Sequence, residues 1–129
     1  MGKRLTVAEL LAKKEQLKQR KKRTQTIYVE SLDAEIVIQE PSHAIALESL
    51  EMAHDPGNND RADIHVVYHC VVEPNLKDAE LQIEFGCAEP TDIVGKVFLP
   101  GEIAAISGHA LQLAGYGTSV RKVDDDLKN

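Results

Sequence analysis

Helix-breaking residues in the stretch 71–115 constrain the fold of this chain most strongly. Pro74, Pro90 and Pro100 lie there, together with five of the eight glycines. Proline cannot continue a helix, because it lacks a backbone N–H and its ring clashes with the preceding turn. The stretch therefore predicts several short helices instead of one long one. It contains no combination of side chains typical of a catalytic site, so we expect a protein that binds other proteins and is not an enzyme.

The length of 129 residues predicts a single domain, 1–129. Aromatic residues make up only 4% of the chain and tryptophan is absent, so aliphatic side chains must form the core. No segment approaches the roughly 18 consecutive apolar residues that a membrane-spanning helix needs, and we expect no membrane partner. Cys70 and Cys87 form no CxxC pair. We expect both to be buried, reduced thiols in a cytosolic protein.

Charge divides the chain into two parts. Residues 1–23 carry nine Lys or Arg and two Glu, a net +7, whereas residues 24–129 carry a net −13. A basic arm therefore precedes an acidic body. Such a division is typical of a segment that contacts nucleic acid or an acidic protein surface.

Periodicity predicts a mainly helical α+β fold, with an N-terminal helix, one β-hairpin and then a bundle of about five short helices. Thr6 and Glu9 form a capping box, so we expect the helix of the basic arm (1–23) to cover 7–22 and to dock through one narrow apolar side. Apolar and polar residues alternate over 24–40, which predicts the hairpin with a turn near Asp33. The helical body is expected over 41–115, with an exposed loop at 55–60, and a polar tail over 116–129.

Caps and stripes of apolar residues define the expected helices of the body. Ser42, Asp60 and Thr91 are candidate N-caps, and Gly86 and Gly115 are candidate helix ends. The expected helices cover the segment after Ser42, then 64–72, 78–85, 91–98 and 102–114. The predicted buried stripes are Ala46, Leu47, Leu50 and Ala53 in the first of these helices and Ile103, Ile106, Ala110 and Leu113 in the last.

Two histidines have the spacing of metal ligands. His65 and His69 are four residues apart on an expected helix and so share a face. The HExxH motif is absent, because Val66 occupies the glutamate position, and no third ligand is evident. We interpret the pair as part of a polar stripe. No glycine-rich phosphate loop occurs either, so we expect no catalytic residue, no metal and no cofactor.

The basic run at the end of the arm has three interpretations. It consists of Lys18, Arg20, Lys21, Lys22 and Arg23. It could be a solvated helix end, since cations are favourable near a helix C-terminus. It could dock on an acidic protein surface, or it could contact nucleic acid phosphates. Nucleic acid is the least favoured partner, because no aromatic residues are interleaved and the body is acidic.

In its order of segments, the chain resembles the XkdN-like tail assembly chaperones of tailed phages. The resemblance spans nearly the full chain. It rests on LTVAELLAKKEQLKQRKKRTQTIYVESLDAEIVIQEPS, on VVEPNLKDAELQIEFGCAEPTDIVGKVFLPGEIAAISGHALQLAGYG and on the ending VDDDLKN. It implies a non-enzymatic protein of the bacterial host cytoplasm that binds the tape-measure protein during tail assembly and is absent from the finished virion.

Two surfaces are candidates for partner binding. The segment around Val94, Val97, Phe98, Leu99, Ile103 and Ile106 is more apolar than short helices need. It is expected either to hold a client helix in a groove or to belong wholly to the core. The basic arm of one copy is also expected to dock on the acidic body of the next, which would give oligomers.

Two other functions remain open. The chain could be a structural tail or head-completion protein that stays in the virion. It could also be a nucleic-acid-binding regulator that uses the basic arm, although no recognition motif is present.

Overall fold

The computed structural model describes residues 3–117 and 120–123. Over these residues the chain forms seven α-helices and one three-stranded antiparallel sheet. The predicted class, mainly α with some β, is confirmed, and five of the helices follow the hairpin as predicted. Part of the predicted tail, residues 118–119 and 124–129, lies outside the described residues.

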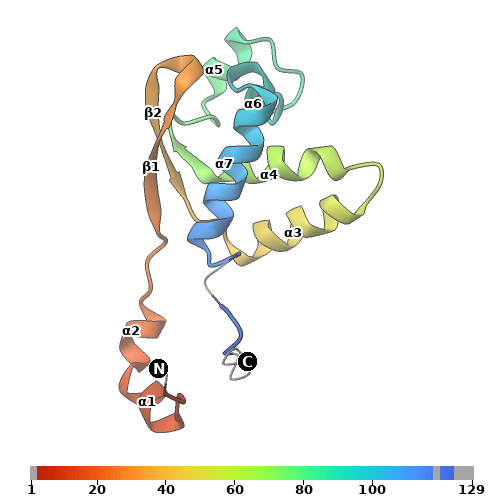
Figure 1. The fold of residues 1–129 in the computed structure, drawn as a ribbon. Coiled ribbons are helices and arrows are strands. Elements are labelled where there is room, and N and C mark those ends of the chain that lie inside the picture. Colours follow the sequence, from red (N-terminus) through yellow and green to blue (C-terminus); the bar gives the residue numbers. More distant parts are fainter. Residues whose placement is uncertain (1–2, 118–119, 124–129) are drawn as a thin grey trace.

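The sheet has the order β1-β2-β3 and is antiparallel throughout (Figure 1). The predicted hairpin consists of β1 (Thr24–Val29) and β2 (Ala34–Gln39). Its turn is a 3-10 segment that ends at Asp33, which has the left-handed φ of 49°. The third strand, β3 (Val71–Glu73), was not predicted. It takes the place of the last residues of the helix expected over 64–72.

The helices can be followed along the chain in Figure 1. They are α1 (Val7–Ala12), α2 (Lys14–Lys18), α3 (His43–His54), α4 (Ala62–Cys70), α5 (Ala79–Glu84), α6 (Asp92–Val97) and α7 (Pro100–Leu113).

The prediction of one helix over 7–22 was wrong. The capping box is present, since the N–H of Glu9 donates to the Thr6 hydroxyl at 3.2 Å and the N–H of Thr6 donates to the Glu9 carboxylate at 3.0 Å. However, the backbone leaves helical geometry at Lys13 (φ −96°, ψ 9°), and α2 ends at Lys18. Consecutive basic side chains follow, and their mutual repulsion disfavours further helix. Figure 1 shows α1 and α2 projecting away from the sheet and the other helices.

The core lies between one face of the sheet and the helices α4, α6 and α7. Ile36 and Ile38 of β2 are almost wholly buried there. The helices contribute Val66, Val67, Cys70, Ile93, Val94, Ile103, Ile106 and Ala110, and Phe98 joins them from the link between α6 and α7. The predicted inner stripe of α7 is therefore confirmed at three positions, while Leu113 is half-buried.

The predicted stripe of α3 was largely wrong. Ala46 is buried as expected, but Leu47, Leu50 and Ala53 are exposed. The second buried residue is Ser49, whose hydroxyl donates to the Ala46 carbonyl at 2.8 Å. Small side chains allow a close approach of α3 to its neighbours, so the larger leucines lie outside this contact.

Several helix ends match the prediction and others do not. Ser42 caps α3 by accepting from the N–H of Ile45 at 3.2 Å, and Gly86 and Gly115 have the positive φ values expected after α5 and α7. The cap predicted at Asp60 was wrong, because the N-cap residue of α4 is Arg61. Thr91 occupies the N-cap position of α6 as predicted, but its side chain makes no capping hydrogen bond.

Candidate partner-binding surface

Arg23 joins the arm to the body. Its guanidinium Nη1 donates to the Leu113 carbonyl at 2.7 Å, and its backbone N–H donates to Oε1 of Glu40 at 2.7 Å. The carbonyl belongs to the last turn of α7, where the helix dipole favours a cation. Of the predicted basic contact residues, Arg23 is therefore already engaged within the chain.

The other four residues of the basic run are exposed. Lys18, Arg20, Lys21 and Lys22 form no ion pair with any residue that the structure describes. The residues after Lys18 adopt no regular helix or strand before β1 begins. Their charges thus remain available to a partner.

The arm also exposes an apolar surface, which we call the arm stripe. It consists of Leu5, Val7, Leu10 and Leu11, whose exposed fractions lie between 42% and 73%. Neither α1 nor α2 contains a buried residue. The sequence predicted that this side would dock on the body or on a partner, and the structure shows that it does not dock on the described body.

The predicted groove around α6 and α7 is mostly core. Val94, Phe98, Ile103 and Ile106 are buried and Val97 is half-buried. Only Leu99 is largely exposed, at 57%. Four of the six apolar side chains lie in the interior of the body, so the core alternative holds for most of this segment but not for Leu99.

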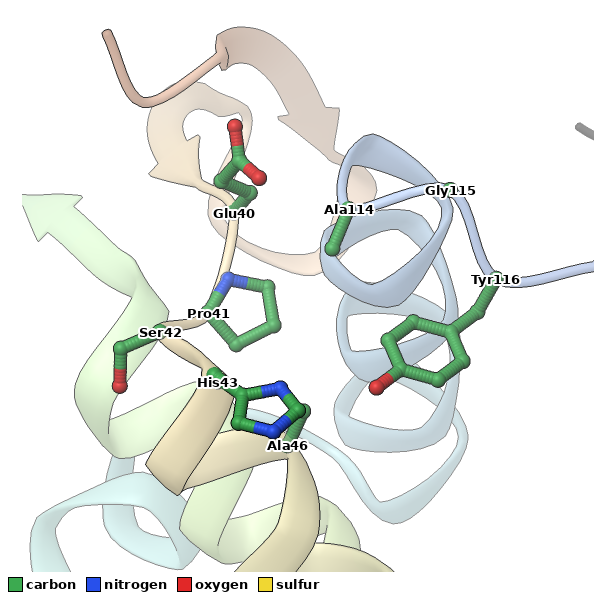
Figure 2. A pocket seen from close by; sticks show the side chains of 8 residues that line it. All are labelled: Glu40, Pro41, Ser42, His43, Ala46, Ala114, Gly115 and Tyr116. Carbon is green, nitrogen blue, oxygen red and sulfur yellow. The ribbon is translucent and has the colours of Figure 1, made fainter. Parts of the chain in front are cut away.

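A cleft of about 260 Å³ lies between the start of α3 and the end of α7. Figure 2 shows Pro41, His43 and Ala46 on one side of it and Ala114 and Tyr116 on the other. The Ser42 hydroxyl beside it caps α3 and so is committed to the N–H of Ile45. The cleft thus offers a small surface of mixed polarity and no activated nucleophile.

His65 and His69 lie side by side on α4, with ring centroids 4.8 Å apart. Nε2 of His65 is 2.8 Å from Oε1 of Glu48, and Nδ1 of His69 is 3.3 Å from Nζ of Lys77. Burial, and then the charge of Lys77, lower the pKa of His69. A neighbouring ammonium also disfavours a metal cation here.

Within residues 3–117 and 120–123, no group of three or more His, Cys, Asp or Glu side chains is arranged to hold a metal ion. Over the same residues no helix has both the length and the apolar character to cross a membrane. The candidate binding features are therefore the exposed side chains of the basic run and the arm stripe.

Sequence reasoning missed further exposed apolar residues. Leu47 and Leu50 were assigned to the core, and the exposure of Ile83 (74%) and Phe85 (45%) was not foreseen. A six-residue helix such as α5 is too short for its periodicity to indicate which side is buried. For α3, the small residues Ala46 and Ser49 were the signal in the sequence that could have indicated the buried side.

The comparisons with known proteins identify a family. The family model described as phage XkdN-like tail assembly chaperone protein matches residues 7–128. No curated protein and no solved structure gives a significant match.

Proposed function

Because the chain belongs to the phage XkdN-like tail assembly chaperone family, we propose that it binds the tape-measure protein while the phage tail is assembled. The family supports a role in tail assembly and protein partners within the tail. The tape-measure protein is the partner that we infer, as an apolar helical client. The role is non-enzymatic.

The arm stripe is the observation that carries this proposal. Helices as short as α1 and α2 are only marginally stable in water unless an apolar side packs against another part of the protein or a partner. The described body leaves this side uncovered, and Leu10 and Leu11 lie on it. An amphipathic helix that packs against an apolar helical client is a common mode of recognition.

The size of the arm stripe limits the affinity of one arm. Full burial of an aliphatic side chain contributes about 1.5–3 kcal/mol. Four side chains that are about half exposed would thus contribute roughly 3–6 kcal/mol before the entropic cost of binding. A micromolar dissociation constant needs about 8 kcal/mol. Several arms therefore act together on one client, because linked sites raise the overall affinity.

Co-expression with the tape-measure protein tests the proposal. We expect the wild-type chain to keep the tape-measure protein soluble and to co-purify with it. The double variant Leu10→Ser/Leu11→Ser should lose both effects. The matched control is Leu47→Ser/Leu50→Ser, which removes two leucines of similar exposure from α3 and should retain both.

Two results would contradict the proposal. One is a tape-measure protein that stays insoluble and unbound with the wild-type chain. The other is an equal loss of binding in both double variants, which would show that the arm stripe has no specific role in binding the tape-measure protein. We also propose that the chain acts in the host cytoplasm and leaves before the tail is finished. Its presence in purified particles, at a fixed number of copies, would favour a structural protein instead.

A further inference from the structure

The two edges of the sheet differ in how they are protected. The β3 edge is three residues long, its register with β2 is irregular at Val37 and Ile38, and Pro74 follows it. Short, bulged edges next to proline resist pairing with another strand. The β1 edge has six residues in unbroken register with β2 and contains no charge and no proline. It lacks the features that normally prevent a second strand from adding.

The free backbone groups of β1 can be assigned from the register. The N–H of Glu40 donates to the Arg23 carbonyl at 2.9 Å, so Arg23 and Glu40 form a hydrogen-bonded pair. Hydrogen-bonded and non-hydrogen-bonded pairs alternate along an antiparallel ladder. Thr24, Thr26 and Tyr28 therefore direct their N–H and C=O groups away from β2, toward the open edge. Their side chains are exposed on the face opposite the core.

We propose that two copies of this chain pair through their β1 edges, antiparallel and around a two-fold axis at Thr26. In this register Thr26 lies opposite Thr26 of the second copy, and Thr24 lies opposite its Tyr28. All three residues with outward backbone groups then find partners. The two sheets become one six-stranded sheet whose ends are the protected β3 edges.

Charge complementarity identifies a second copy as the partner. The residues before β1 are basic, namely Arg20, Lys21 and Lys22, and an acidic group follows it, formed by Glu30, Asp33 and Glu35. No Lys or Arg among the described residues lies within 4 Å of these three carboxylates. Antiparallel self-pairing places each basic flank beside the acidic flank of the other copy, and Lys22 falls opposite Glu30.

The surface next to the β1 edge fits the same arrangement. A cleft of about 340 Å³ lies between β1 and α7, and its lining combines the apolar Ile27, Val29 and Ile106 with the polar Glu30, Glu102 and His109. A two-fold axis perpendicular to the sheet places α7 of both copies on the same face. Each copy would then cover the cleft of the other, which adds burial of the apolar part of the lining to the backbone hydrogen bonds.

The mass of the full chain in solution tests the pairing without any client. We expect a dimer for the wild type and a monomer for Thr26→Lys at the same concentration, since like charges directly opposite each other destabilise a strand pair. The control is Gln39→Lys on the same face of the central strand β2, which should remain a dimer. A monomeric wild type, or a mass unchanged in Thr26→Lys, would overturn the proposal.

Crosslinking tests the register. In a Cys87→Ser background, Thr26→Cys places two thiol-bearing residues about 5.5 Å apart across the axis. Thr24→Cys has the same side chain on the same face, but the two copies of residue 24 are offset by four residues, about 14 Å. A bis-maleimide shorter than that offset should link the first variant and not the second. Equal linking of both would exclude this register.

A charge swap tests the contact between the flanks. Lys22→Glu should weaken dimerisation, and addition of Glu30→Lys to the same chain should restore it. If the double variant dimerises no more tightly than Lys22→Glu alone, these residues do not lie opposite each other. Because these tests use the chain alone, they can fail while the client-binding proposal stands, and the reverse also holds.

Discussion

Substitution of Phe98 distinguishes a core residue from a groove residue. The side chain is only 3% exposed and packs in the cluster formed by the sheet, α4, α6 and α7. Truncation of a buried phenylalanine to alanine costs about 3–5 kcal/mol, because it removes the buried surface and leaves a cavity. Native domains have only about 5–15 kcal/mol of stability. Phe98→Ala should therefore lower the free energy of unfolding by a large share of the total.

The adjacent residue is the matched control. Leu99 is 57% exposed, so Leu99→Ala should change the free energy of unfolding by less than about 1 kcal/mol. In thermal melts, Phe98→Ala should lower Tm by about 10–18 °C for a chain of this length. Urea denaturation gives the free energies directly. Equal, small effects of the two substitutions would refute the assignment of Phe98 to the core.

Three further predictions concern Ser107 and Cys70, which are buried, and His69, which is half-buried. Ser107→Ala should raise the free energy of unfolding by about 1 kcal/mol in urea denaturation, because the buried hydroxyl has no partner among the described residues; a loss of stability would show that it has one. Burial raises the pKa of the Cys70 thiol to about 11, so a thiol reagent at pH 8 should label half-buried Cys87 in the native protein and Cys70 only after unfolding. Burial and Lys77 lower the pKa of His69, so the folded state loses stability as the pH falls below about 6.5. In thermal melts, His69→Gln should lose less stability below that pH than the wild type does. Equal losses would show that His69 is not the source of this pH dependence.

The sequence predicted the local elements better than their contacts. The hairpin with its turn at Asp33, the cap at Ser42 and the helix stop at Gly86 follow from local chemistry, and all are present. The strand β3 depends on pairing with β2, more than 30 residues earlier in the chain. No local pattern encodes such a contact, so the expected helix was extended through Val72.

The candidate surface was only partly predictable, for a related reason. The amphipathic character of the arm can be read from the sequence, but whether its apolar side is covered depends on the direction in which the chain leaves the sheet. The apolar residues around Phe98 and the leucines of α3 have similar patterns, yet the first group is buried while Leu47 and Leu50 are exposed. Size alone does not indicate the buried side when small residues such as Ala46 make the contact.

Hydrogen exchange of the arm, measured with and without the tape-measure protein, tests the central claim most directly. In the free chain the amides of residues 7–18 should exchange rapidly, because α1 and α2 contain no buried residue. Binding should protect these amides, with the largest change around Leu10 and Leu11, since the arm stripe becomes covered. Binding that leaves the exchange of the arm unchanged and protects another surface would contradict the claim.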